Sequence, residues 1–228
     1  EALDCFEQMK NEGLDPDVVS FVSILQACII IGAIDKGKQI HEEIINRGLL
    51  RENVVIGNAL VNMYGKCGML AQARQVLYEL PVRNIVTWST LIAGHAQHEQ
   101  GWEALDCFAQ MQREGFSPNE FTLSCILKAC GNTGTFEEGK RILHENISDG
   151  HLVSTNIILG TALMDMYVKC GKLTKAEEVH KKLYIRDVVS WSTIIARLAQ
   201  QGQGYEAFDC FERMKKEGHY ADEVTFIC

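Results

Sequence analysis

Nine cysteines are the residues of this 228-residue sequence with the widest chemical scope. Cysteines form disulfides, hold zinc or act as nucleophiles, and their spacing distinguishes these uses. No Cys-x-x-Cys pair and no cysteine–histidine quartet with zinc-ligand spacing occurs in the sequence. There is also no glycine-rich phosphate loop, no Ser/His/Asp arrangement and no spaced cluster among the histidines His95, His98, His151, His180 and His219. We therefore expect no catalytic residues, no metal site and no cofactor.

An internal repeat accounts for all nine cysteines. The segment Glu-Ala-Leu-Asp-Cys-Phe at 1–6 recurs at 103–108 and, with one change, at 206–211, and segment 57–93 matches 160–196 at 19 of 37 positions. The cysteines occupy four repeat positions: Cys5, Cys107 and Cys210; Cys28 and Cys130; Cys67 and Cys170; Cys125 and Cys228. Disulfides join different positions, so this register favours reduced cysteines that pack as small hydrophobic residues in a reducing compartment.

Composition and charge exclude several classes of protein. Apolar residues make up 46% and charged residues 23%, which is typical of neither a disordered nor a fibrous chain. The longest apolar runs fall far short of the roughly 20 residues that span a bilayer, so no membrane association is expected. A net charge of −8 argues against generic electrostatic binding of nucleic acid.

Apolar residues at helical spacing predict paired helices throughout the chain. The predicted helices cover 22–27 and 34–45, 57–64 and 70–77, and 87–96 and 103–111, with breaks at Gly32, Gly68 and Gly115. Segments 18–21 and 85–88 are rich in β-branched residues but short, and each leads directly into a helix. Trp88 and Trp191 recur at one position and are expected to pack between helices. Tandem helix hairpins of this kind predict an all-α solenoid, in which each unit buries its apolar face against its neighbours.

The repeat units alternate in length. Counted from the residue after each terminal Asp or Asn, they have 36, 31, 35, 37, 31 and 35 residues, at 18–53, 54–84, 85–119, 120–156, 157–187 and 188–222. Segments 1–17 and 223–228 are partial units. A tetratricopeptide array keeps one length and carries a W-x₂-L-G-x₂-Y signature, which is absent.

The sequence resembles the plant pentatricopeptide repeat family, in its subclass of alternating long, short and standard motifs. Val-Val-Ser-Trp-Ser-Thr at 188–193 followed by Glu-Ala-x-x-x-Phe-x-x-Met at 206–214 resembles a standard motif. Gly-Asn-Ala-Leu at 57–60 with Met-Tyr-Gly-Lys-Cys-Gly at 63–68 resembles a short motif, and Ile-Leu-Gln-Ala-Cys at 24–28 a long one.

On this reading, 18–53 and 120–156 are long motifs and 223–228 begins another. Segments 54–84 and 157–187 are short motifs, and 85–119, 188–222 and the end at 1–17 are standard. The resemblance implies a right-handed superhelical α-solenoid of antiparallel helix hairpins that binds single-stranded RNA, one base per repeat.

In that family, the fifth and the last residue of a motif read one base together. A carboxylate accepts hydrogen bonds from guanine, whereas an amide both donates and accepts. The pairs implied here are Asn58 with Asn84 for a pyrimidine, Ser89 with Asn119 for adenine, and Thr161 with Asp187 and Ser192 with Asp222 for guanine. The long motifs offer the weaker pairs Val22 with Asn53 and Ser124 with Asn156. The implied target, read 5′ to 3′ along the chain, is pyrimidine-A-x-G-G.

The resemblance also implies residues that flank the bases and contact phosphates. The second residue of a motif lies between successive bases, which implies this role for Val55, Val86, Ile158 and Val189. Lys66 and Lys169 resemble the phosphate contacts of the family. Each assignment has a simpler alternative: Asn, Ser and Thr near helix starts are ordinarily caps, aliphatic residues are ordinarily core, and a last-turn lysine complements the helix dipole.

Relatives in this subclass often end in a zinc-dependent cytidine deaminase-like domain, so we looked for its motif. His41-Glu42-Glu43 satisfies H-x-E, but no P-C-x-x-C follows, and the duplicate does not keep the glutamate in register. The resemblance therefore implies a non-enzymatic module with no small-molecule substrate, which recognises the target of an organellar C-to-U RNA editing or RNA-processing factor in mitochondria or chloroplasts. Accessory editing proteins would dock through the long motifs. The alternative is a protein-binding α-solenoid scaffold.

Overall fold

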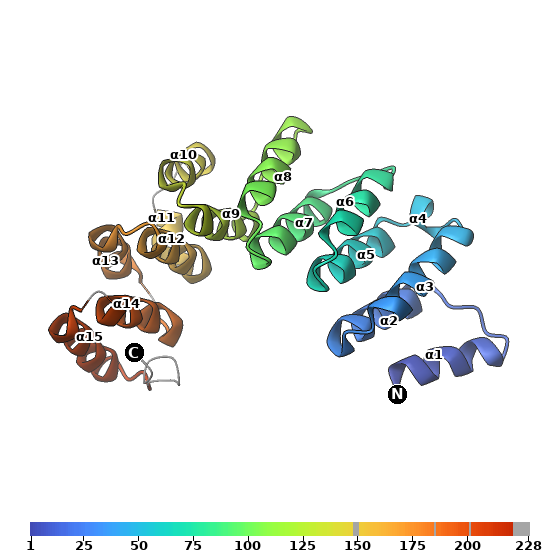
Figure 1. Cartoon of the computed structure of the whole chain (residues 1–228), viewed down its shortest axis with the longest axis horizontal. Coiled ribbons are helices and arrows are strands. Elements are labelled where there is room, and N and C mark those ends of the chain that lie inside the picture. The colour runs from blue at the N-terminus through green and yellow to red at the C-terminus, as the bar shows by residue number, and fades with distance from the viewer. Residues whose placement is uncertain (148–150, 185, 201, 221–228) are drawn as a thin grey trace. The chain divides into compact units, whose positions relative to one another are not determined.

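A computed structural model of the chain describes residues 1–147, 151–184, 186–200 and 202–220, and within these ranges every regular element is a helix (Figure 1). The chain divides into two compact units, Glu1–Ser117 and Pro118–Cys228. The first unit contains α1 (Ala2–Asn11), α2 (Val18–Ile31), α3 (Ile34–Asn46), α4 (Leu49–Glu52), α5 (Val54–Lys66), α6 (Leu70–Glu79), α7 (Ile85–Gln97) and α8 (Gly101–Arg113). The second contains α9 (Glu120–Thr133), α10 (Phe136–Asn146), α11 (His151–Thr155), α12 (Ile157–Lys169), α13 (Leu173–Lys182), α14 (Val188–Gln200) and α15 (Gly204–Lys216). None of the described helices is long and apolar enough to cross a membrane.

The helices that open the motifs begin earlier than their apolar spacing predicts. α2 begins at Val18 rather than at residue 22, and α7 begins at Ile85 rather than at residue 87. The cause is an Asp or Asn cap: an Asp17 carboxylate oxygen accepts from the Ser20 amide at 2.8 Å, and Oδ1 of Asn84 accepts from the Thr87 amide at 2.9 Å. Because the cap satisfies a free amide of the first turn, the β-branched residues after it are helical rather than extended.

Within each unit, the first helices of successive motifs pack side by side. In the first unit α5 lies between α2 and α7, and in the second unit α12 lies between α9 and α14. Each first helix also packs against the second helix of its own motif, as α5 does with α6 and α7 with α8. The structure thus has the tandem helix hairpins of an α-solenoid, as the sequence predicts, and no strand occurs in the described ranges.

Two recurring tryptophans connect the second helix of one motif to the first helix of the next. Trp88 and Trp191 are fully buried, as their shared register predicts. The Tyr78 ring of α6 meets Trp88 edge-on at 6.4 Å between ring centroids, and the His180 ring of α13 meets Trp191 in the same way at 4.3 Å. These contacts hold the second helix of a short motif against the first helix of the next motif.

The long motifs carry a short extra helix that the apolar pattern does not predict. α4 lies between α3 and α5, and α11 precedes α12 at the matching place in the second unit. A glycine in the left-handed conformation, Gly48 with φ +73°, begins α4. These extra helices lie directly before Asn53 and Asn156, the terminal residues of the long motifs.

The cysteines are free thiols throughout the described residues. Cys28, Cys107 and Cys130 are buried, as predicted, and burial raises the pKa of Cys107 and of Cys130 to about 11. The packing prediction is wrong for Cys5, which is exposed because only one face of α1 is covered. Cys228 lies outside the described residues.

Candidate nucleic-acid interface

The second residue of every complete motif is a large apolar side chain exposed to solvent. We call this set the second-residue row. It lies on the first turns of α2, α5, α7, α9, α12 and α14, and its exposed fractions are Val19 69%, Val55 51%, Val86 50%, Phe121 51%, Ile158 66% and Val189 57%. A core role for these side chains is therefore wrong. The sequence analysis did not assign this position to Val19 and Phe121, although they are the second residues of the long motifs 18–53 and 120–156.

In the part of the chain that the structure describes, the terminal residue of each motif caps the first helix of the next motif. The cap-to-amide hydrogen bonds are 2.8–3.0 Å long and are made by Asp17, Asn53, Asn84, Asn119, Asn156 and Asp187. In each bond one side-chain oxygen accepts from a backbone amide, so the second polar atom of the side chain is not needed for the cap. The terminal residue can therefore serve the helix and a ligand together.

The structure brings one predicted base-reading pair together. Asn58 of α5 and Asn84, the cap of α7, meet at the hydroxyl of Thr87. Thr87 Oγ1 lies 2.7 Å from Asn58 Oδ1 and 2.9 Å from Asn84 Oδ1. The fifth and the last residue of motif 54–84 thus share one partner, although they are far apart in the sequence.

The serines and threonine predicted to read purines are less accessible. Ser89 and Ser192 are 3% and 4% exposed, and Ser192 Oγ donates to the Val188 carbonyl oxygen at 2.7 Å. Thr161 Oγ1 is buried and has no hydrogen-bond partner among the described residues. Asp187, its predicted companion, uses Oδ1 to cap α14 at 2.8 Å from the Ser190 amide.

The members of the Ser89–Asn119 pair lie in different compact units: Ser89 belongs to the first unit and its predicted companion Asn119 to the second. Asp222, the companion of Ser192, lies outside the described residues.

The predicted long-motif pairs have different surroundings. Val22 is half-buried, and Asn53 Oδ1 accepts from the Val55 amide at 2.9 Å. Ser124 Oγ donates to the Phe121 carbonyl oxygen at 2.8 Å. Asn156 uses both polar atoms, because Oδ1 accepts from the Leu159 amide and Nδ2 donates to the Glu120 carboxylate.

Lys66 and Lys169 are exposed at the ends of α5 and α12 but have different neighbours. Lys66 Nζ donates to Gln97 Oε1 of α7 at 3.0 Å. Lys169 Nζ donates to Asn132 Oδ1 of α9 at 2.9 Å and pairs with the Asp165 carboxylate at 2.9 Å. Only the second lysine is therefore partly neutralised within its own helix.

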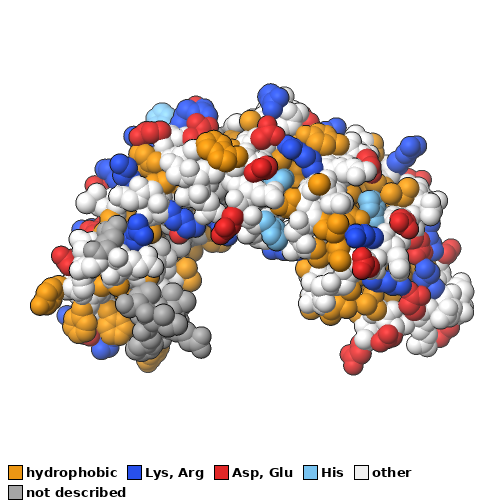
Figure 2. All heavy atoms as spheres, in the orientation of Figure 1, with side chains coloured by type: hydrophobic (Ala, Val, Ile, Leu, Met, Phe, Trp, Pro, Cys, Tyr) orange, Lys and Arg blue, Asp and Glu red, His pale blue; other side chains and the backbone are white. Residues whose placement is uncertain are grey.

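The acidic charge of the protein is not on the first helices. The six helices that open complete motifs carry four cationic residues and two acidic ones, namely Lys66, Lys128, Lys169 and Arg197 against Glu120 and Asp165. The whole chain carries a net charge of −8, so the excess of carboxylates lies on the second helices and the connecting segments. Figure 2 shows acidic, basic and apolar side chains interspersed over one face. The net charge therefore does not describe the surface that carries the second-residue row.

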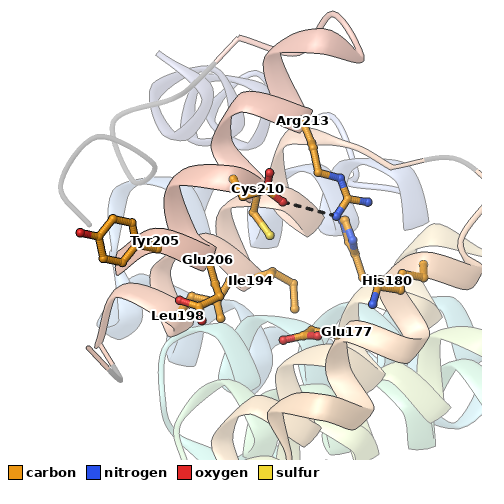
Figure 3. A pocket seen from close by; sticks show the side chains of 10 residues that line it. Glu177, His180, Ile194, Leu198, Tyr205, Glu206, Cys210 and Arg213 are labelled. Atoms are coloured by element: carbon orange, nitrogen blue, oxygen red, sulfur yellow. Dashed lines mark ion pairs between the residues drawn. The ribbon is translucent and has the colours of Figure 1, made fainter. Parts of the chain in front are cut away.

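A cavity of about 400 Å³ lies among α13, α14 and α15 of the second unit (Figure 3). Its lining includes His180, Cys210 and an Arg213–Asp209 ion pair at 4.0 Å. Burial and nearby cations lower the pKa of His180 to about 4, and burial raises the pKa of the Cys210 thiol. At neutral pH the lining therefore holds a neutral imidazole and a protonated thiol, which are poor candidates for a nucleophilic pair. No group of three metal-ligating side chains gathers anywhere in the described ranges.

The helix hairpins define the chain as an α-solenoid, and its first helices carry the exposed second-residue row. The comparison with family models is specific: the PPR repeat family matches residues 83–132 and 186–228, the pentatricopeptide repeat domain matches 4–67, and the PPR repeat matches 58–85 and 161–186. These matches cover most of the chain. The chain belongs to the pentatricopeptide repeat family.

Similar sequences occur in Arabidopsis thaliana. Pentatricopeptide repeat-containing protein At2g33680 is 37% identical over 227 residues, covering 100% of this chain and 31% of the relative. A chloroplastic relative, At4g18520, is 38% identical over 99% of this chain and 36% of its own length. A mitochondrial relative, At1g06140, is 34% identical over 100% of this chain and 40% of its own length. The chain thus spans about a third of the length of these relatives.

Solved structures show the same fold. The pentatricopeptide repeat protein PPR10 of maize, crystallised with an 18-nt psaJ RNA element, superposes with a TM-score of 0.81 over 99% of this chain and 33% of that chain, at 18% identity. The nuclear proteinaceous RNase P 2 of A. thaliana superposes with a TM-score of 0.56 over 74% of this chain and 39% of that chain, at 16% identity.

Proposed function

We propose that this chain binds single-stranded RNA sequence-specifically, with one base per motif. The observation that carries the proposal is the second-residue row, in which six motifs expose an apolar side chain beside the cap residue that ends the preceding motif. Exposed apolar side chains next to amide and carboxylate groups suit unstacked bases, which offer an apolar face and a polar edge. The likeness to PPR10, a protein crystallised with RNA, supports the same assignment.

The proposed target is pyrimidine-A-x-G-G. The Asn58–Asn84 pair reads the pyrimidine, Ser89 with Asn119 reads adenine, and the pairs that end in Asp187 and Asp222 read guanine. A carboxylate oxygen left over from a cap accepts from guanine N1–H or N2–H, whereas a leftover amide nitrogen donates to an acceptor on the base. Lys66 and Lys169 contact phosphates.

In the whole protein we expect this module to select the target of an organellar RNA editing or RNA-processing factor. The alternating motif lengths support the long–short–standard subclass, and relatives named as chloroplastic and mitochondrial support an organelle. The module itself positions RNA and catalyses nothing. Accessory proteins dock on the long motifs.

The test compares two equally exposed apolar residues. Ile158 belongs to the second-residue row and Val82 lies in the loop between α6 and α7, and both are 66% exposed. Ile158→Asp should weaken binding of a labelled RNA carrying pyrimidine-A-x-G-G by about tenfold, since it places a charge where a base stacks. Val82→Asp should leave binding unchanged, and both variants should unfold at the wild-type temperature.

Fluorescence polarisation with matched and permuted RNAs provides the readout. Equal binding of both RNAs by the wild type would contradict sequence-specific recognition. Equal effects of the two substitutions would contradict the role of the row.

A protein-binding scaffold is the second candidate function. It is favoured by exposed aromatic side chains on second helices, since Trp102 of α8 is 64% exposed and Tyr205 of α15 is 95% exposed at the same register. Such side chains are enriched at protein interfaces. Absence of RNA binding even at low salt would favour this function.

A further inference from the structure

A hydroxyl group recurs at the third residue of four motifs, next to the terminal residue of the motif before. Three of these hydroxyls lie within hydrogen-bond distance of the terminal side-chain oxygen: Ser20 of Asp17 at 2.7 Å, Thr87 of Asn84 at 2.9 Å, and Thr122 of Asn119 at 2.7 Å. The fourth, Ser190, donates to the Asp187 backbone carbonyl at 2.8 Å. Thr87 and Thr122 are fully buried, so no base can contact them directly.

Thr87 differs from the others because it reaches both members of a base-reading pair. Its Oγ1 lies 2.7 Å from Asn58 Oδ1 and 2.9 Å from Asn84 Oδ1, and it accepts from the Asn84 backbone amide at 3.3 Å. Both carboxamide oxygens therefore lie within hydrogen-bond distance of one buried hydroxyl, which has a single proton to donate. Asn84 Oδ1 also accepts from the Thr87 backbone amide at 2.9 Å, so the hydroxyl proton is available to Asn58 Oδ1. Because a carboxamide is planar, both Nδ2 groups point away from Thr87, and neither donates to any residue within the described ranges.

A carboxamide can both donate and accept hydrogen bonds. In this orientation, Asn58 and Asn84 present only their Nδ2 donors to a ligand. A pyrimidine offers acceptors to such a surface, O2 and N3 in cytosine and O2 and O4 in uracil. Guanine presents N1–H and N2–H donors on the same edge, and adenine presents one acceptor beside an amino group. An amide free to rotate by 180° would satisfy any of these bases and would discriminate weakly.

We infer that Thr87 is a positioning residue for base selection: its backbone amide orients Asn84, and its hydroxyl orients Asn58 by donating its single proton to Asn58 Oδ1, so that motif 54–84 selects a pyrimidine. The inference rests on the proposed function, and it adds a residue outside the reading pair to the determinants of specificity. Thr122 orients Asn119 through its backbone amide, which lies 2.8 Å from Asn119 Oδ1.

The long motifs lack this device. The short motifs that follow them have fully buried apolar residues at the third position, Ile56 and Leu159, which carry no hydroxyl. Backbone amides orient Asn53 and Asn156, and the Nδ2 of Asn156 is occupied by the Glu120 carboxylate. A long motif therefore has no third-residue hydroxyl that could orient its fifth residue.

The experiment compares Thr87→Val with Thr122→Val as its matched control. Valine keeps the shape of threonine and the backbone amide but removes the hydroxyl. With RNAs that vary the first or the second base of pyrimidine-A-x-G-G, Thr87→Val should reduce the preference for a pyrimidine about fivefold and leave the adenine preference intact. Thr122→Val keeps the amide that orients Asn119 and should leave both preferences unchanged, and Thr87→Ser should restore the wild-type ratio.

The ratio of affinities separates positioning from stability. A purely structural threonine would change the unfolding temperature and weaken all RNAs equally, and that outcome would overturn the inference. A wild-type protein with no base preference would instead contradict the proposed function. A wild-type preference that survives in Thr87→Val would contradict the inference alone.

Discussion

Lys66 and Lys169 occupy equivalent positions in the two short motifs but have different electrostatic surroundings. Both end the first helix of a short motif, where a cation also complements the helix dipole. Asp165 lies 2.9 Å from Lys169, whereas the matching residue near Lys66 is the uncharged Asn62. A phosphate approaching Lys169 therefore competes with a carboxylate.

We expect Lys66→Ala to weaken RNA binding more than Lys169→Ala. Loss of one unscreened phosphate contact should lower affinity about threefold to fivefold at low salt, and the effect of Lys169→Ala should be about half of that in free-energy terms. Asp165→Asn should strengthen binding in the wild type and leave a Lys169→Ala variant unchanged. Binding isotherms at low ionic strength measure the wild type and all four variants, and equal losses for both lysines would contradict the role of Asp165.

His180 is a residue whose burial links stability to pH. Burial beside Trp191, and then the nearby cations Arg186, Arg213 and Lys181, lower its pKa to about 4 from an ordinary value of 6.5. The unfolded chain therefore binds a proton between these values and the folded chain does not. Stability from this group is fully present above pH 6.5 and is lost as the pH falls toward 4.

We expect His180→Leu to reduce this acid sensitivity. Leucine is the natural residue at the matching position, Leu77, where it is fully buried. Between pH 7 and 4.5 the wild type should lose about 1–2 kcal/mol more unfolding free energy than the variant. Urea unfolding at both pH values measures the difference. His41 and His95, whose pKa values burial also lowers, should account for acid sensitivity that remains, and an unchanged slope in the variant would refute the assignment to His180.

At the scale of elements, close helix contacts depend on glycines in the first helices. A Cβ on Gly160 of α12 would lie 2.4 Å from Leu183 Cδ2 and 2.9 Å from the Val153 carbonyl oxygen. The second contact is with backbone, which cannot move aside as a side chain can. α12 therefore sits against the α11 segment and Leu183 at a distance that only glycine allows.

We expect Gly160→Ala to destabilise the protein by about 1–3 kcal/mol, despite the better helix propensity of alanine. The control is Gly204→Ala at the start of α15, where an added Cβ meets nothing within 4 Å. That variant should be neutral or stabilised by up to about 1 kcal/mol. Thermal unfolding of both variants measures the contrast, and similar behaviour of the two would contradict the proposed close contact.

At the scale of the whole molecule, charge is divided between two kinds of helix. The chain is acidic, but its first helices hold more cations than carboxylates. RNA on the first helices would therefore meet few lysines and a row of apolar side chains. Base contacts rather than phosphate contacts should supply most of the binding free energy.

We expect the RNA affinity to depend only weakly on salt. With two phosphate contacts, at Lys66 and Lys169, the slope of log K against log salt should be about −1.4. Titrations from low to moderate potassium chloride measure it. A slope near −4 or steeper would require many more phosphate contacts than the first helices offer, and would contradict this division of charge.

The sequence by itself determined the repeat and the hairpins, because these depend on residues close together in the chain. The helix starts are local as well, but they follow from the caps and not from the apolar spacing, which predicted them too late. Asp17 and Asn84 cap helices through amides three residues away, so local order suffices to position them. The register also predicted that Trp88 and Trp191 pack between helices, since buried aromatic residues repeat with the hairpins.

Only the tertiary structure decided which apolar side chains stay exposed and which polar groups meet. Val55 and Ile56 are neighbours of similar hydrophobicity, yet Val55 is 51% exposed and Ile56 is fully buried. Packing between helices covers the face of α5 that carries Ile56 and leaves the face that carries Val55 open to solvent. The meeting of Asn58 with Asn84 at Thr87 likewise depends on α5 lying beside α7. Contacts between helices act across about thirty residues of sequence, and no local pattern specifies them.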